Sequence, residues 1–111
     1  MLEVTFFRDA RKRVTAIVAR GHADAGPHGK DLVCAAASAI LQAARLGLEE
    51  HVRVPLDATA LPGELRMRWP RSARSDAALR AIVATAELSI AHLAKQYPRH
   101  VRVRRRSDKT G

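Results

Sequence analysis

Cys34 is the only cysteine of this 111-residue chain, and His22 lies twelve residues before it. A thiol with an ordinary pKa is only a few per cent ionised at neutral pH, so it needs help to act as a nucleophile. A histidine that takes the thiol proton gives this help, because the resulting imidazolium holds the thiolate as an ion pair. His22 and Cys34 are therefore candidate catalytic residues.

A helix-start signal stands directly before Cys34. Asp31 suits an N-cap, which makes Cys34 the third residue of the helix. Unpaired N–H groups and the positive end of the helix dipole favour an anion at this position. The same N–H groups could stabilise the oxyanion of a tetrahedral intermediate. Ser38, one turn further on the same face, could orient a catalytic group.

Residues 21–30 connect the histidine to the helix and are rich in glycine and proline. We expect a loop that returns His22 to the helix start, with Gly26 and Gly29 giving it the freedom to act as a lid over a peptide. Asp24 could steer the imidazole as a third member, although its spacing does not require this role.

Each of these residues also has a purely structural interpretation. A lone cysteine is often a small buried hydrophobe, Asp31 can serve as a cap only, and Ser38 can bond a backbone carbonyl. His28 can be a solvated loop residue. A metal site of His22, His28 and Cys34 would lack the closely spaced ligand pairs of such sites, so we expect neither a metal nor a cofactor.

Hydrophobic periodicity predicts the order ββαββαβ along the chain. Leu65, Met67 and Trp69, for example, alternate with charged residues, and the second helix starts at a cap, Ser75 or Asp76. The expected strands are 2–6, 14–19, 51–56, 64–69 and 101–104, and the expected helices are 32–49 and 77–97. The first two strands are expected to form a hairpin.

These elements define an α+β fold, a single layer of about five mostly antiparallel strands with two helices packed on one face. The other face of the sheet would be wet or lie in a polar interface. It would carry Glu3, Thr5, Arg66, Arg68, Arg102 and Arg104. We expect one domain over residues 1–105 and a disordered basic tail over 106–111.

The chain is strongly basic, with a formal net charge of +9 from 20 Lys and Arg against 11 Asp and Glu. Such a charge favours RNA or a ribosome as a partner, although a merely solvated basic surface explains it equally well. The sequence shows no signal peptide and no apolar run of membrane-span length, so we expect a cytoplasmic protein without a membrane partner.

Two runs carry a family resemblance: GHA at 21–23 followed by GKDLVCAAASAI at 29–40, and the helix, Tyr97-Pro98 and strand pattern of 90–103. They resemble the ribosomal-processing cysteine proteases of the Prp family over essentially the whole chain. The loop differs from many relatives, which carry an aromatic residue where this chain reads DAGPH at 24–28, and Ala37 replaces a more usual valine.

The resemblance implies a small α+β homodimer in which Cys34 is the nucleophile and His22 the base. It also implies the substrate, a ribosomal protein precursor from which the enzyme removes a short N-terminal extension. That protein is the 27th of the large subunit. The function expected from the sequence is therefore a cysteine endopeptidase of ribosome maturation. The alternative is a non-catalytic basic module that binds ribosomes or RNA through the arginines of 99–106.

Overall fold

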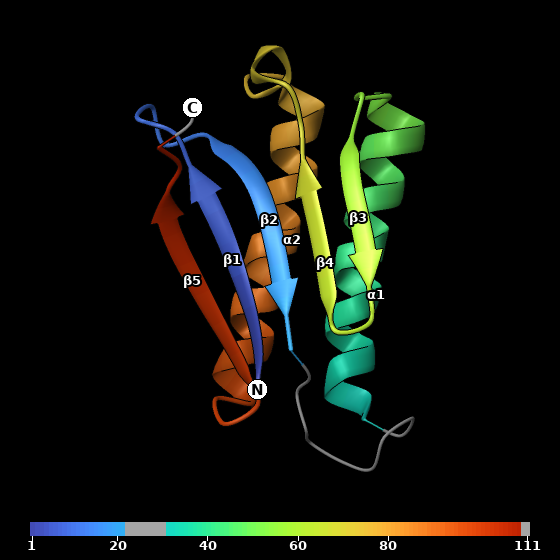
Figure 1. Ribbon diagram of the computed structural model, residues 1–111, viewed down its shortest axis with the longest axis vertical. Coiled ribbons are helices and arrows are strands. Elements are labelled where there is room, and N and C mark those ends of the chain that lie inside the picture. The colour runs from blue at the N-terminus through green and yellow to red at the C-terminus, as the bar shows by residue number, and fades with distance from the viewer. Residues whose placement is uncertain (22–30, 110–111) are drawn as a thin grey trace.

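A computed structural model describes residues 1–21 and 31–109. It shows one five-stranded sheet in the order β3-β4-β2-β1-β5, with two helices on one of its faces (Figure 1). The fold class expected from the sequence is confirmed. The strands are β1 (Leu2–Arg8), β2 (Val14–Arg20), β3 (Asp57–Leu61), β4 (Glu64–Arg68) and β5 (Val101–Ser107), and the helices are α1 (Leu32–Leu46) and α2 (Ala77–Gln96).

The strand β1 lies between β2 and β5. It pairs with β2 as the expected antiparallel hairpin and with β5 in the parallel sense. Leu2, Val4 and Phe6 are buried on its helix-facing side, and Phe6 and Val4 are completely inaccessible to solvent. Since side chains alternate along a strand, the residues between them lie on the other face, which no helix covers (Figure 1). We call this uncovered side the open face.

Both helices lie with an apolar stripe against the sheet. In α2 the buried positions include Leu79, Val83, Ile90 and Leu93, at the expected three- and four-residue spacing. Segments 32–52 and 77–96 are also long and apolar enough in composition to cross a membrane. No apolar run of membrane-span length was expected from the sequence. Of the most apolar window of each segment, 28% and 33% is buried inside the fold, where the apolar stripes face the sheet.

The prediction of a strand at 51–56 is wrong. A π-helical segment, Gly47–Val52, continues α1, and Arg53 then takes a left-handed conformation with φ 61°. The amide of Val54 donates to the carbonyl of Leu48 at 3.0 Å, which closes the turn. The alternating apolar residues of this stretch pack on the core without strand pairing. The strand itself, β3, starts only at Asp57 and forms an edge of the sheet.

The end of the chain is also more ordered than expected. β5 runs to Ser107, so Arg106 and Ser107 belong to the sheet and not to a disordered tail. The amide of Asp108 donates to the carbonyl of Arg8 at 2.7 Å, and its carboxylate accepts from Thr15 Oγ1 and Arg68. Parallel pairing with β1 supplies partners for the backbone of these charged residues, which hydropathy alone does not indicate.

Glu87 of α2 ties the helix to two strands. Its carboxylate, 9% exposed, accepts hydrogen bonds from Arg8 of β1 and Arg105 of β5. Burial by itself would raise the pKa of Glu87, but the two guanidinium groups outweigh it and hold this pKa below its usual value. Ionised Glu87 therefore stabilises the folded state.

We expect Glu87→Gln to lower the free energy of unfolding at pH 7 by about 1–2 kcal/mol, because two charge-assisted hydrogen bonds are weakened. The pKa of Glu87 is lower in the folded state, so its contribution is complete above the unfolded pKa of about 4.3 and is lost as the pH falls through the folded value. Urea unfolding at pH 7 and pH 3 measures both effects. Glu50→Gln, at an exposed position, is the control. An unchanged gap between wild type and Glu87→Gln at pH 3 would contradict this role.

Candidate active site

The start of α1 places Cys34. Asp31 is the N-cap, with extended backbone angles, and its Oδ1 accepts a hydrogen bond from the Cys34 amide at 3.0 Å. Its carbonyl accepts from the Ala35 amide, also at 3.0 Å. The expected cap is confirmed, and Cys34 is the third residue of the helix. The cap fixes the backbone of Cys34 and therefore the direction of its side chain.

The same cap limits which amides can act on a substrate. The amides of Cys34 and Ala35 already donate to Asp31. Within the described part of the chain, the first-turn amides that have no acceptor are those of Leu32 and Val33. The expectation that first-turn amides bind an oxyanion is therefore narrowed to these two, because an amide engaged with a carboxylate is not free to donate to a substrate.

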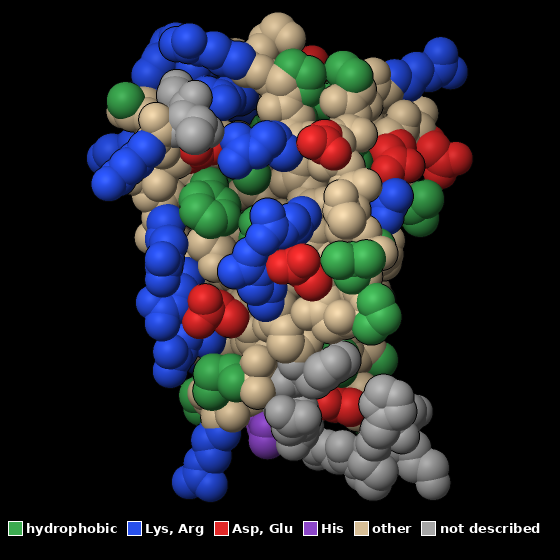
Figure 2. All heavy atoms as spheres, viewed as in Figure 1, with side chains coloured by type: hydrophobic (Ala, Val, Ile, Leu, Met, Phe, Trp, Pro, Cys, Tyr) green, Lys and Arg blue, Asp and Glu red, His purple; other side chains and the backbone are tan. Residues whose placement is uncertain are grey.

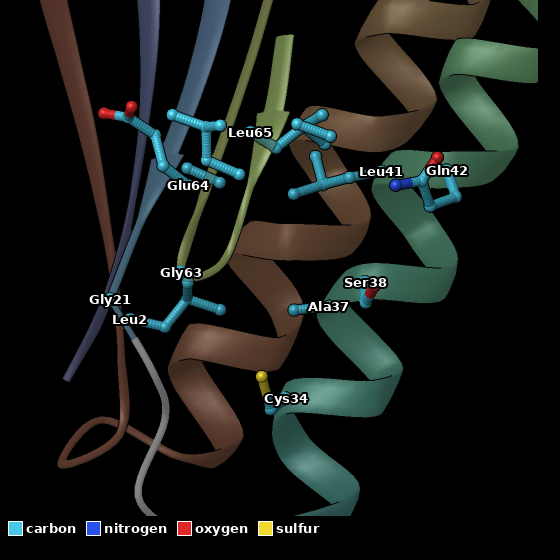
Figure 3. Close-up of a pocket in the computed structure, with 13 residues that line it drawn as sticks. Leu2, Gly21, Cys34, Ala37, Ser38, Leu41, Gln42, Gly63, Glu64 and Leu65 are labelled. Atoms are coloured by element: carbon cyan, nitrogen blue, oxygen red, sulfur yellow. The ribbon is translucent and has the colours of Figure 1, made fainter.

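The half-buried side chain of Cys34 points into a pocket of about 190 Å³ between α1 and one end of the sheet (Figure 3). Ser38, one helical turn along, lines the same pocket and is exposed to solvent. The lining is mainly apolar, with Gln42 and Glu64 among its polar members. The other lining residues are Leu2, Ala19, Gly21, Ala37, Leu41, Ala60, Leu61, Gly63 and Leu65. A pocket of this kind can hold an apolar side chain beside the thiol.

The turn between β3 and β4 is held against the end of β2. The amide of Gly21 donates to the carbonyl of Gly63 at 2.8 Å. Gly21 has φ +93°, and a Cβ at this position would lie 2.3 Å from the Met1 carbonyl oxygen. Only glycine fits both the conformation and the space. Gly21 therefore sets the direction in which the chain leaves β2, immediately before His22.

Several of the expected site residues cannot be placed. His22, Gly26 and Gly29 lie outside the described residues, as do Asp24 and His28. The pairing of His22 with Cys34, the lid and the alternative metal site therefore stay predictions. Of the histidines that the structure describes, His100 lies at the same end of the sheet as Cys34, since its carbonyl accepts from the amide of Leu2 at 2.9 Å.

Sequence reasoning missed the contribution of β3 and β4 to the pocket. Pro62-Gly63 reads as a turn, but nothing in the sequence says that this turn lies opposite Cys34. The strand order provides the reason, since β4 pairs with β2 and brings Gly63 beside Gly21. Leu2 was likewise expected only as a core residue, yet it lines the pocket.

A thiol in the first turn of a capped helix, with its side chain in a pocket, suits a nucleophilic cysteine. The sequence model of the family described as "Cysteine protease Prp" matches residues 1–102. The chain therefore belongs to the cysteine protease Prp family and is an enzyme that hydrolyses peptide bonds. No curated protein matches the chain significantly.

Solved structures agree on the fold. The ribosomal processing protease Prp from S. aureus, in complex with a covalently linked product peptide, superposes with a TM-score of 0.88 at 24% identity, covering 95% of this chain and 99% of that one. The same S. aureus protease with a substrate peptide gives 0.81 at 23% identity, with the same coverage. SMU.848 from Streptococcus mutans gives 0.79 at 25% identity, covering 97% and 96%.

The cap of α1 can be tested against the cap of α2, which has the same geometry. Asp76 Oδ1 accepts from the Leu79 amide at 2.9 Å. We expect Asp31→Ala and Asp76→Ala each to lower the free energy of unfolding by about 1 kcal/mol. Asp31→Asn should keep most of the stability of the wild type, because an asparagine side chain can also act as an N-cap. Because only Asp31 holds Cys34, only Asp31→Ala should also change the rate at which iodoacetamide alkylates the thiol. Equal alkylation rates in both alanine variants would contradict the positioning role of Asp31.

Proposed function

We propose that this protein is a cysteine endopeptidase in which Cys34 is the nucleophile and His22 the general base. The observation that carries the proposal is the position of Cys34. A cysteine protease needs a nucleophilic cysteine, and the one cysteine of this chain stands in the first turn of a capped helix with its side chain in a pocket. His22 follows Gly21, whose hydrogen bond to Gly63 keeps the end of β2 at this pocket.

The reaction takes place in two halves. His22 removes the thiol proton, and the thiolate attacks the carbonyl carbon of the scissile bond. The oxyanion accepts hydrogen bonds from the amides of Leu32 and Val33. As the C–N bond breaks, the imidazolium gives its proton to the leaving amine, and a thioester to Cys34 remains. Water, deprotonated by His22, then attacks the thioester, which releases the carboxylate product and returns the thiol.

We further propose that the substrate is the precursor of the 27th protein of the large ribosomal subunit, from which the enzyme removes a short N-terminal extension. The S. aureus relative is a ribosomal processing protease, solved both with a substrate peptide and with a covalently linked product peptide. The apolar lining of the Cys34 pocket supports binding of an apolar side chain of that peptide.

The other implied properties stay predictions. These are the homodimer, the cytoplasmic location and a lid that includes Gly26 and Gly29. The non-catalytic alternative is not retained as the protein's function, because the chain belongs to a family of proteases. A basic surface remains to be explained, and it can coexist with catalysis.

The dyad can be tested with a peptide that spans the junction of the extension. We expect Cys34→Ala and His22→Ala to abolish cleavage measured by mass spectrometry, since each removes one partner of the proton transfer. His100→Ala is the matched control, because His100 is the described histidine at the same end of the sheet. Cleavage by the Cys34→Ala enzyme would overturn the assignment of the nucleophile. Loss of cleavage in His100→Ala but not in His22→Ala would overturn that of the base.

The peptide pocket can be tested on β3, where neighbouring side chains point to opposite faces of the sheet. Ala60 and Thr59 are both exposed, but only Ala60 lines the Cys34 pocket. We expect Ala60→Phe to raise KM for the peptide at least tenfold by filling the pocket, while alkylation of Cys34 by the small reagent iodoacetamide continues. Thr59→Phe should leave both the KM for the peptide and the rate of alkylation unchanged. An unaltered KM in Ala60→Phe would show that the peptide does not enter this pocket.

A further inference from the structure

The open face of the sheet gathers arginines from three strands, β2, β4 and β5. Strand register places Arg102, Arg104 and Arg106 of β5 opposite Glu3, Thr5 and Phe7 of β1. Arg66 and Arg68 of β4 lie opposite Val18 and Ala16 of β2, and Arg20 lies opposite Glu64. Lys and Arg side chains cover much of this face, with fewer acidic groups between them (Figure 2). We call these six residues the arginine face: Arg20, Arg66, Arg68, Arg102, Arg104 and Arg106.

The acidic groups near this face are already engaged. Glu64 accepts from Arg20 at 2.7 Å and lies 3.4 Å from Arg66, and Glu3 accepts from Arg104 at 2.8 Å. Asp108 accepts from Arg68 at 3.0 Å. Arg102 and Arg106, both exposed, have no acidic partner among the described residues. The arginine face therefore keeps an excess of positive charge and of unused N–H donors, which suits a polyanion.

The arginine face also has a hollow that an aromatic ring lines. A cavity of about 290 Å³ opens between β5, β1, β2 and β4. Two half-buried apolar side chains line it, Phe7 and Val18. The remaining lining is polar or charged and consists of Glu3, Thr5 and the arginines at positions 20, 66, 68 and 106. Phe7 offers an aromatic ring on which a planar group can stack, within reach of guanidinium groups.

From this combination we infer that the arginine face binds single-stranded nucleic acid. One base would enter the hollow and stack on Phe7, while phosphates of the same strand contact Arg102 and Arg106. Arg102 and Arg106 are four residues apart on β5, about 13 Å along the strand, so they would contact phosphates that are not adjacent in the bound strand. The Asp and Glu side chains of an acidic polypeptide would bind the arginines but carry no aromatic ring that could stack on Phe7.

The site is separate from the Cys34 pocket. Cys34 and its pocket lie on the helix-covered side of the sheet, whereas Arg102, Arg106 and Phe7 face the open side. Binding does not depend on the proposed protease chemistry, so the two can fail independently. Nucleic acid bound to the arginine face would hold the protease on RNA and leave the Cys34 pocket accessible to a peptide.

The test uses fluorescence anisotropy with a labelled single-stranded RNA of mixed sequence, over a range of salt concentrations. The full-length Cys34→Ala protein should bind as the wild type does. Arg102→Ala with Arg106→Ala should weaken binding and reduce the slope of log K against log salt by about 1.4, or 0.7 for each lost phosphate contact. Neither arginine has an acidic partner among the described residues to leave unpaired.

A matched control removes the same charge from the other side of the molecule. Arg80 and Lys95 are exposed on α2. Arg80→Ala with Lys95→Ala should leave the salt slope unchanged. Phe7→Leu, which keeps an apolar side chain, should weaken binding about tenfold through lost stacking. Equal losses in the α2 double variant would show a non-specific charge effect and overturn the site.

Two further ligands decide what the face recognises. A DNA oligonucleotide of the same sequence has the same phosphates and nearly the same bases. Tighter binding of the RNA identifies RNA as the ligand. Equal binding of both shows that the face recognises the phosphates and bases that single-stranded RNA and DNA share. Polyglutamate carries charge without bases. If polyglutamate of equal charge binds as tightly as RNA, or if Phe7→Leu binds RNA unchanged, the base in the hollow is ruled out and the inference fails.

Discussion

The strand β1 is hydrogen-bonded along both edges, to β2 on one side and to β5 on the other. Its apolar side chains Leu2, Val4 and Phe6 all point toward the helices, because the side-chain period of a strand is two. Because β2 and β5 pair with β1 in a fixed register, the alternation in β1 also decides which side chains of these strands point toward each face of the sheet. The helices must cover one face, and charged residues of the strands collect on the other, except Arg8 and Arg105, which bind Glu87 of α2.

The position of the candidate site follows from the same arrangement. α1 packs on the helix-covered face and begins at the end of the sheet where β2 finishes and β1 starts (Figure 1). The Asp31 cap then sets the rotation of the first turn, so that the half-buried Cys34 points into the pocket beside the sheet. The Asp31 carboxylate binds the Cys34 amide and stabilises this geometry. In the proposed mechanism it leaves the amides of Leu32 and Val33 to bind the oxyanion.

Local signals in the sequence were sufficient for most of the elements. Asp31 identified the first helix start and the pair Ser75 or Asp76 the second, because an N-cap is a contact between residues three apart; the structure shows that Asp76 is the second cap. The alternation of Val52, Val54 and Leu56 misled, since a π-helical turn and a left-handed Arg53 bury the same residues without a strand. Long-range pairings could not be predicted. The place of β5 beside β1, and of Gly63 opposite Cys34, depends on contacts between residues far apart in the chain.

The parallel pairing of β1 with β5 has a consequence for the order of folding. The first strand of the chain stays incomplete at one edge until the last strand has been synthesised, because residues 2–8 pair with residues 101–107. Such a long sequence separation slows the formation of the contact. The backbone of Leu2, which lines the Cys34 pocket, is held by the carbonyl of His100. A nascent chain that lacks its last strand therefore has an unfinished pocket, and peptidase activity should appear only after the final strand leaves the ribosome.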